Sequence, residues 1–360
     1  MKNLRKGGHH SIMNTTFSPD VMKGRNRTMK KIMALLLCLT MALGLSACAA
    51  AEDAAPLKVS LCVAETLGDL GFYDGIADGI AKLAADYGVV TSTVECKSDA
   101  SMYQVALVEA AESSDIVVAA GWQFWDGLTA VAPEMPDTKF IFVDNGLDGV
   151  GDNLLSIVYA ENEGSFLAGY VAMKVAPNAC VGVVAAEDSE TINNFVVGYR
   201  QGALYANPDG KVLDPVYTDG DYDSPDKGKE AALSLFGQGA DVVYQVAGKT
   251  GLGVFEAAKE QGKYAIGVDS DQKYIAPETI ICSMMKDAGG SVYEAISNFI
   301  EDGVFEGGTI WEADMASGYV KLGFGDEDLP QQVSAELQDE ALGLADMIVD
   351  GEIVVESTRK

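Results

Sequence analysis

The sequence predicts an α/β fold with two doubly wound lobes, each a mainly parallel sheet between layers of helices. Residues 48–360 number about 313 (360 − 47), which is more than one hydrophobic core usually serves. Strand-like apolar runs alternate with helical stripes in two successive series. Residues 116–118 and 140–143 are apolar throughout, as in strands that helices cover on both faces.

The first series of elements spans residues 57–145. Its expected strands are residues 57–64, 89–96, 115–121 and 139–145. Its expected helices are residues 74–87, 100–112 and 124–132. In the first of these helices every third or fourth residue is apolar, which gives one buried stripe: Ile76, Ile80, Leu83 and Tyr87.

The second series has the same rhythm. Its expected strands are residues 153–160, 179–186, 211–218, 241–247 and 264–268, and its expected helices are residues 162–175, 190–205, 225–236 and 251–261. The tail predicts a strand at 280–285, a helix at 290–300, strand-like segments within 310–324 and a final helix at 335–349. Ligands of such sheets bind beyond the carboxyl ends of the strands, so candidate site residues should directly follow strands.

The first 48 residues contain a segment typical of secretion. Lys30 and Lys31 precede an apolar run at residues 32–45, which is too short to span a bilayer. The run ends in Leu-Ser-Ala-Cys at residues 45–48, which resembles the lipobox of bacterial lipoproteins, in which the cysteine is lipidated. We therefore expect a signal peptide up to residue 47, with Met29 a candidate initiator, a lipid anchor on Cys48, and a tether at residues 48–56.

Charge and histidine content exclude several classes of function. Residues 48–360 hold 17 basic and 53 acidic residues, a formal net charge of −36. A surface this acidic repels the phosphate backbone of nucleic acids, so we expect no nucleic-acid partner. His9 and His10 are the only histidines, and both precede the expected cleavage site. The secreted part therefore lacks the commonest general base and transition-metal ligand, and we expect no enzyme activity.

The cysteines and carboxylates give little support to a metal site. Four cysteines lie in apolar, strand-like runs without a CxxC pair, and buried free thiols are favoured over disulfides: Cys62, Cys96, Cys180 and Cys282. Asp219, Asp221, Asp223 and Glu230 keep the spacing of a calcium loop, but Ser224 replaces its turn glycine and a strand precedes it. We expect an acidic turn that caps the next helix, and no metal or cofactor.

Polar and aromatic residues gather after successive strands. These loops are residues 68–73, 121–126, 248–251 and 269–272. They bring carboxylates and rings to one edge of the sheets, an arrangement suited to a planar base and ribose hydroxyls. The alternative is that Phe72, Trp122 and Phe124 only pack between the lobes.

Several motifs in these loops and helices resemble the basic membrane protein family of ABC transporter substrate-binding lipoproteins. They are GDLGF at 68–72, GWQFWD at 121–126, PDTKF at 136–140, EGSFLAG at 163–169, GKTGLGVFEAAK at 248–259, GVDSDQ at 267–272 and SMMK at 283–286. The resemblance implies a type I periplasmic binding protein fold whose chain crosses between the lobes several times. On this basis we assign residues 57–160 and 287–307 to the first lobe and residues 161–286 and 308–360 to the second.

The resemblance also implies roles for residues that would contact a base. Phe72 and Tyr222 would stack on its two faces, while Asp69 and Asp126 would accept hydrogen bonds from the ligand. Tyr73 stands where the family usually has asparagine, so the base preference is open at this position.

Three further roles concern the sugar. Asp269 and Lys286 would hold the ribose hydroxyls, and Gly248 would let the backbone approach closely. The resemblance thus implies capture of a nucleoside, with a purine nucleoside favoured, by a lipid-anchored protein on the outer side of the cell membrane, and delivery to an ABC permease and its ATPase. The alternatives are the same fold binding riboflavin or a sugar, a ligand sensor, and a metal- or carboxylate-based hydrolase.

Overall fold

The computed structural model describes residues 55–359. The chain divides into two units, Met1–Ala55 and Pro56–Lys360, and all elements discussed below lie in the second. The expected signal peptide, the lipidation site Cys48 and most of the tether lie outside the described residues. None of the described helices is both long enough and apolar enough to cross a bilayer.

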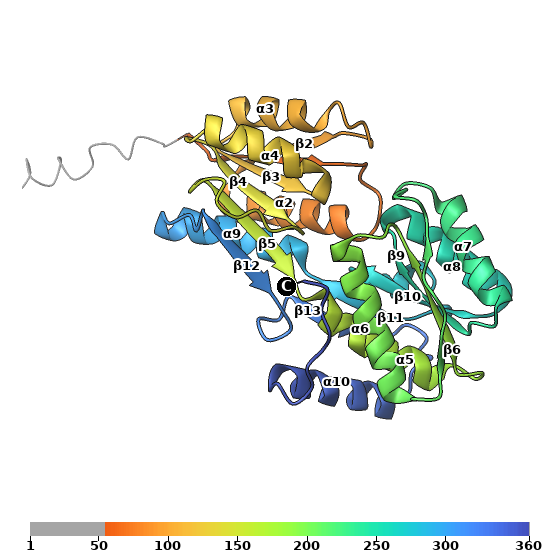
Figure 1. Cartoon of the computed structure of the whole chain (residues 1–360). Coiled ribbons are helices and arrows are strands. Elements are labelled where there is room, and N and C mark those ends of the chain that lie inside the picture. The colour runs from red at the N-terminus through yellow and green to blue at the C-terminus, as the bar shows by residue number, and fades with distance from the viewer. Residues whose placement is uncertain (1–54, 360) are drawn as a thin grey trace, which may run out of the picture. The chain divides into compact units, whose positions relative to one another are not determined.

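The first lobe is built on a six-stranded parallel sheet. Its order is β12-β5-β4-β3-β1-β2, with bounds Thr309–Ala313 (β12), Leu154–Tyr159 (β5), Lys139–Val143 (β4), Ile116–Ala120 (β3), Lys58–Val63 (β1) and Val90–Glu95 (β2). Side chains alternate between the faces of β1, since Leu61 and Cys62 belong to different core clusters. Helices α3 (Tyr103–Ser113) and α4 (Trp125–Val131) cover the face of Cys62, and both lie at the top of Figure 1.

The second lobe is built on a seven-stranded sheet with one antiparallel edge strand. Its order is β13-β11-β10-β9-β6-β7, and β8 pairs with β6. The bounds are Val320–Gly323 (β13), Ile280–Lys286 (β11), Tyr264–Asp269 (β10), Val242–Val246 (β9), Cys180–Ala185 (β6), Lys211–Val212 (β7) and Val216–Tyr217 (β8). Only β13 runs antiparallel to its neighbour.

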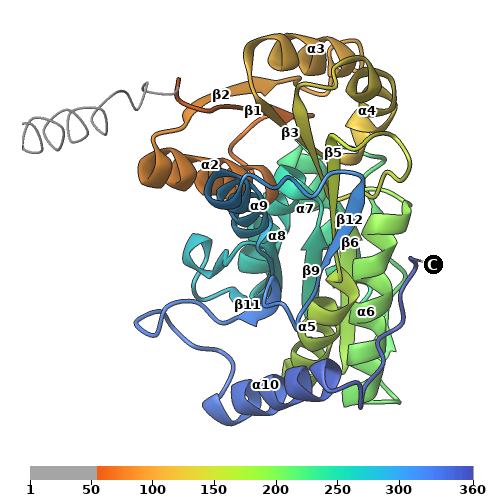
Figure 2. The ribbon, with the colours of Figure 1, turned by 90° about the vertical axis from the view of Figure 1, so that its left-hand side faces the viewer.

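Helices cover both faces of this second sheet. One face carries α7 (Pro225–Gly237) and α8 (Leu252–Gln261). The other carries α5 (Glu161–Val175) and α6 (Glu190–Ala206), with α10 (Ala335–Val349) against α5, as Figure 2 shows. The predicted α/β class with two doubly wound lobes is confirmed.

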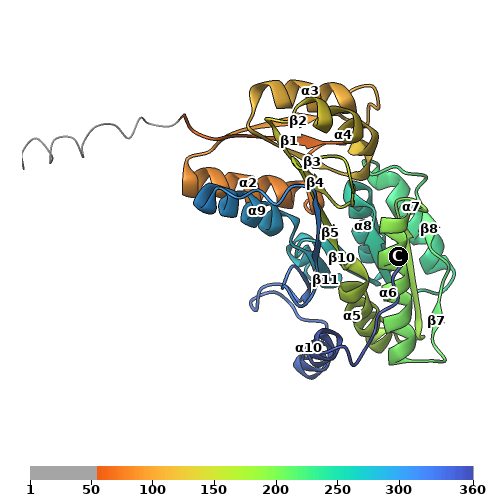
Figure 3. The same ribbon diagram turned by 60° about the vertical axis from the view of Figure 1, so that its left-hand side comes forward.

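The chain crosses between the two sheets three times: from β5 to α5, from β11 to α9 (Ala288–Asp302), and from β12 to β13. Helix α9 packs beside α2 (Phe72–Tyr87), although they are more than 200 residues apart in sequence (Figure 3). Their contact depends on Gly79 and Gly289, because a Cβ on Gly79 would lie 2.3 Å from the carbonyl oxygen of Gly289. The hinge thus has three connections, as expected for a multi-crossing fold.

Two expectations about the strands need correction. Residues 309–313 pair with β5 in the first sheet, whereas the sequence assignment placed them in the second lobe; a strand pattern does not reveal a partner 150 residues away. The expected strand at 211–218 is two short strands, and Pro215 lies between them. Proline has no N–H to donate to a ladder, so it interrupts the pairing.

The four cysteines of the described residues agree with the prediction of free thiols. Cys62, Cys96, Cys180 and Cys282 are all buried and unpaired. Burial raises the pKa of Cys62 to about 12 and that of Cys96 to about 11. These thiols therefore act as small apolar core residues.

Candidate ligand-binding site

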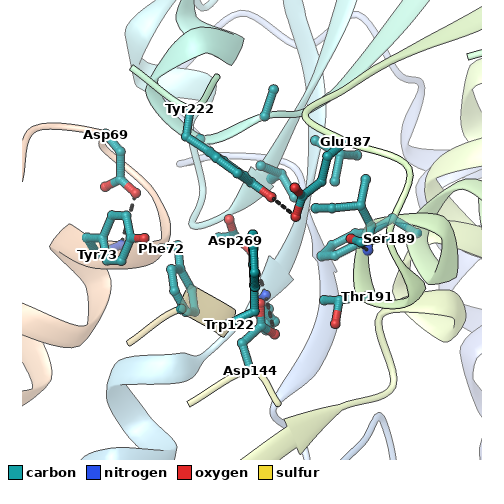
Figure 4. A pocket seen from close by; sticks show the side chains of 18 of the residues that line it. Asp69, Phe72, Tyr73, Trp122, Asp144, Glu187, Ser189, Thr191, Tyr222 and Asp269 are labelled. Atoms are coloured by element: carbon teal, nitrogen blue, oxygen red, sulfur yellow. Dashed lines mark hydrogen bonds and ion pairs between the residues drawn. The ribbon is translucent and has the colours of Figure 1, made fainter. Parts of the chain in front are cut away.

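A cavity of about 60 Å³ lies where the carboxyl ends of strands from both sheets meet. Its lining comes from the segments after β3, β4, β6, β9, β10 and β11 and from the start of α2. Figure 4 labels ten of these residues, with Phe72 and Tyr73 from one lobe and Tyr222, Glu187 and Asp269 from the other.

One end of the cavity is formed by Lys286, Asp144 and Asp269, which we call the ionic end. Lys286 ends β11, Asp269 ends β10, and Asp144 directly follows β4 in the other lobe. The Lys286 ammonium lies 2.9 Å from Asp144 Oδ1 and 3.4 Å from Asp269 Oδ1. Of these, only the contact with Asp144 is a hydrogen bond, and Asp269 Oδ1 has no hydrogen-bond partner among the described residues.

Burial and the neighbouring opposite charges shift the pKa values at the ionic end in opposite directions. Burial lowers the pKa of Lys286, but Asp144, Asp269 and Glu161 outweigh it, so the net direction is upward and the ammonium stays charged. Burial raises the pKa of Asp269 to about 6 against the opposing pull of Lys286. An ionised Asp269 with a free acceptor atom is ready to take hydrogen bonds from ligand hydroxyls.

Aromatic rings surround the same ammonium. Its nitrogen lies 4.7 Å from the ring centroid of Phe72, 5.1 Å from that of Phe195 and 5.4 Å from that of Tyr159. Cation–π attraction at these distances holds the lysine in place. Phe72 therefore forms both the aromatic wall of the cavity and one side of the lysine cage.

The opposite end of the cavity is rich in hydrogen-bond acceptors, and we call it the acceptor end. It comprises the lining residues Tyr73, Gln123, Glu187 and Tyr222, with Glu65 behind them. The Tyr73 hydroxyl and the Gln123 amide nitrogen donate to the two oxygens of Glu65, the latter over 2.7 Å. The Tyr222 hydroxyl donates to Glu187 Oε1 over 3.0 Å, the dashed line of Figure 4.

Strand order explains why the two ends are separate. Glu65 follows β1, Gln123 follows β3 and Asp144 follows β4, and these strands are neighbours in the order β4-β3-β1. Adjacent strands lie about 4.8 Å apart, so the outer two segments start about 10 Å from one another. The sheet itself spaces the two ends at a distance suited to a base and its sugar.

Asp69 is buried, but its carboxylate serves its own helix. Its oxygens accept hydrogen bonds from the backbone N–H groups of Gly71, Tyr73 and Asp74, at 2.9 to 3.1 Å. These are orphan donors at the start of α2, which a carboxylate at this position satisfies. Burial raises the pKa of Asp69 to about 6 even so. The structure therefore gives Asp69 a positioning role behind Phe72 and Tyr73.

The remaining predicted residues divide between the cavity and its rim. Phe72, Tyr73, Tyr222, Gly248, Asp269 and Lys286 line the cavity together with Asp69. Gly248 has a φ of +54°, and Tyr222 packs against it. Asp126 is exposed and lies outside this cavity, in a neighbouring depression that also contacts Trp122 and Ser189. The structure does not bring Asp126 together with the others.

Several lining residues were not predicted. They are Gln123, Asp144, Asn145, Glu187, Ser189, Thr191 and Phe195. Asp144 and Glu187 directly follow buried apolar strands, so the rule that selected Asp269 would have found both. Ser189 and Thr191 lie at the start of α6, where Ser189 Oγ accepts a hydrogen bond from the Ile192 N–H, and a capping pattern alone does not point to a cavity.

The acidic loop at residues 219–223 behaves as a turn. Asp221 accepts hydrogen bonds from Asp223 N and Ser224 Oγ and pairs with Lys227, while Asp223 pairs with Lys249. No cluster of His, Cys, Asp or Glu fit to hold a metal ion occurs within residues 55–359. These pairs leave little free coordinating capacity. The expected acidic turn is present, but no side chain caps the start of α7, so the expected capping role is wrong.

Contacts between the lobes bring the cavity walls together. Gln272 Nε2 donates to Leu70 O over 3.0 Å, and Ser270 Oγ donates to Gly71 O over 3.2 Å. Gln272 also accepts a hydrogen bond from Gln245 within the second lobe. Because Leu70 and Gly71 directly precede α2, these bonds hold the segment that leads into Phe72 against the second lobe.

Comparison with known proteins agrees with this architecture. The family model described as "ABC transporter substrate-binding protein PnrA-like" matches residues 57–359. The chain belongs to this family. It is 30% identical to basic membrane protein A of Borreliella burgdorferi over 307 residues, covering 84% of this chain and 88% of that protein. It is 32% identical to basic membrane protein D of the same species, covering 86% and 91%.

A solved structure also resembles the PnrA-like chain. The ABC transporter solute-binding protein of Aeropyrum pernix K1 superposes with a TM-score of 0.76 at 27% identity, covering 85% of this chain and 94% of that one. Members of the PnrA-like family bind substrates for ABC transporters and are not enzymes; they work outside the cytoplasm in association with the membrane. The predicted family is therefore confirmed, and a small-molecule ligand and a permease partner follow from membership.

Proposed function

We propose that this protein captures a nucleoside between its two lobes and delivers it to the permease of an ABC importer. The observation that carries the proposal is the ionic end beside an aromatic wall. Asp269 Oδ1 lies 3.4 Å from the Lys286 ammonium and accepts no hydrogen bond among the described residues, and Phe72 lies against the same lysine. Ribose hydroxyls and a planar base are the pair of chemical features that fit these two surfaces.

Charge favours a nucleoside over a nucleotide. Lys286 is the one cation among the lining residues, and Asp144 and Asp269 already pair with it. Asp69 and Glu187 add further carboxylates to the lining. A phosphate group would meet a site of net negative charge and no free cation.

Phe72 and Tyr222 would provide the stacking surfaces. They come from different lobes, so a base held between them would link the lobes and favour the closed state. Closed protein would then be the form that the permease accepts. Membrane attachment would come from lipidation of Cys48 after signal cleavage, which replacement of Cys48 by alanine should abolish, releasing the protein from membranes.

The test is thermal stabilisation of the purified protein by a panel of nucleosides, free bases, sugars and riboflavin. A ligand that binds only the folded state adds about 2.7 kcal/mol at a hundredfold excess over its Kd. Nucleosides should raise the Tm, and Asp269→Asn should remove the effect, whereas Asp339→Asn on the exposed side of α10 should not. A response confined to sugars or riboflavin would contradict the proposal.

A further inference from the structure

The acceptor end contains a polar atom that the fold leaves without a partner. Gln123 Oε1 is buried and makes no hydrogen bond within the described residues. In the structure Gln123 Nε2 donates to Glu65 Oε1 over 2.7 Å, and this contact turns Oε1 away from Glu65. The carbonyl oxygen therefore remains as an unused acceptor in a wall of the cavity.

Gly121 makes room for this oxygen. A Cβ on Gly121 would lie 2.6 Å from Gln123 Oε1 and 3.1 Å from the Tyr73 hydroxyl. The backbone at Gly121 has a φ of +107°, which only glycine adopts readily. Tyr73, Gln123 and Gly121 thus form one compact wall, and Glu65 behind it positions the amide without facing the cavity.

The other acceptors at this end are carboxylates. Glu187 lines the cavity, and only its Oε1 has a partner, the Tyr222 hydroxyl. Both tyrosine hydroxyls at this end donate to carboxylates, so their protons are already used. The wall therefore offers unused acceptor capacity at Gln123 and Glu187, and a ligand edge placed there is favoured if it carries donors.

We propose that Gln123 and Glu187 determine specificity by selecting bases with an exocyclic amino group over the corresponding oxo bases. This inference rests on the proposed nucleoside function and adds the class of base to it. An amino group supplies two N–H donors to the acceptor end. An oxo group at the same position places an acceptor against an acceptor, and its desolvation is not compensated.

Matched nucleosides test the proposal by calorimetric titration of the purified protein. Adenosine carries an amino group at C6 and an acceptor at N1, inosine carries an oxo group at C6 and a hydrogen on N1, and purine riboside has neither the amino nor the oxo group. The expected result is that adenosine binds about tenfold more tightly than inosine, with purine riboside between them. Cytidine should likewise bind more tightly than uridine. Equal or tighter binding of the oxo member in both pairs would overturn the proposal.

Two variants separate recognition from simple loss of structure. Glu187→Gln exchanges an acceptor for a donor and should narrow or reverse the preference for adenosine, while the neighbouring exposed carboxylate variant Asp188→Asn should leave it unchanged. Gln123→Met should weaken adenosine binding and leave purine riboside within about twofold of the parent protein. An equal loss for both ligands would mean that Gln123 only supports the fold, and the proposal would be wrong.

The outcome also separates this proposal from the one on which it rests. If no nucleoside binds at all, the nucleoside function fails and the base preference fails with it. If nucleosides bind without an amino preference, the function stands and only the roles of Gln123 and Glu187 are rejected.

Discussion

Lys286 and Asp144 form an ion pair across the cavity, with 2.9 Å between Nζ and Oδ1. Lys286 is the last residue of β11 in the second lobe, and Asp144 follows β4 in the first. The pair therefore connects the lobes through the ligand site itself. Any change at either residue should affect both the binding of ligand and the approach of the lobes.

Replacement of Lys286 by methionine should destabilise the protein as well as abolish nucleoside binding. It would leave Asp144 and Asp269 facing each other without a cation, and breaking a buried pair typically costs about 3–5 kcal/mol. Chemical denaturation measures this loss. Adding Asp144→Asn to Lys286→Met should restore part of the stability but none of the binding; an additive further loss would contradict the charge argument.

The face of the Phe72 ring should contribute to nucleoside affinity by stacking on the base. Stacking on an aromatic ring is worth about 1–3 kcal/mol per base, so Phe72→Leu should weaken nucleoside binding by about tenfold or more. Phe72→Tyr keeps the ring and should bind within a few-fold of the parent protein. Titration calorimetry gives both values, and equal affinities of the leucine and tyrosine variants would exclude stacking at this position.

Replacement of Asp69 should lower the stability of the protein, whereas replacement of Asp126 should change neither stability nor affinity. Asp69→Ala removes the acceptor for three N–H groups at the start of α2, and loss of a helix cap costs about 0.5–2 kcal/mol. The Tm should therefore fall. Asp126→Asn changes an exposed residue outside the cavity and should leave the Tm unchanged and the affinity within about twofold of the parent value. A large loss of affinity in Asp126→Asn would show that Asp126 takes part in ligand binding.

Stability without ligand should decrease as the pH rises. Burial, with Asp69 and Glu187, raises the pKa of Glu65 from 4.5 to about 8, and burial raises that of Asp269 from 3.8 to about 6. At a pH between the unfolded and the folded pKa of each carboxyl, the folded protein keeps a proton that the unfolded chain has released. The stability that these two groups contribute is therefore full below about pH 4 and is lost as the pH rises through about 6 for Asp269 and about 8 for Glu65. Thermal melts from pH 4.5 to 8.5 measure this. Glu65→Gln should flatten the slope above pH 6; an unchanged slope would contradict the assignment.

A phosphate group on the nucleoside should weaken binding. The ionic end has one ammonium that two carboxylates already neutralise, so a nucleoside 5′-monophosphate brings further negative charge without a partner. We expect at least a tenfold weaker affinity than for the parent nucleoside. Competition between adenosine and its monophosphate checks this, and comparable affinities would show that a cation outside the described contacts serves the phosphate.

The sequence predicts the fold well because local patterns decide it. Apolar runs such as residues 140–143 define buried strands, and the rule that ligand residues follow strands selects Asp269 and Gly248, which line the cavity. Lys286, which also lines it, was expected from the family resemblance. The same rule does not distinguish Asp69 from Asp126. Both follow strands, but only the three-dimensional path of α2 shows that the oxygens of Asp69 are already used.

Other features were beyond sequence reasoning because they depend on distant pairing. The Asp144–Lys286 ion pair joins residues 142 apart, and the hydrogen bond that Gln123 donates to Glu65 arises only when β1 and β3 lie side by side. Membership of β12 in the first sheet has the same origin. Periodicity identifies a strand, but its neighbour is chosen by the packing of the whole lobe.

The place of β12 also has a consequence for the order of events during synthesis. The other five strands of the first sheet come from residues 58–159, but β5 gains its outer neighbour only when residues 309–313 emerge. The second sheet likewise receives its edge strand from residues 320–323. A nascent chain that ends at residue 300 therefore holds two unfinished sheets, and the lobes reach their native form together, late in translation, rather than one after the other.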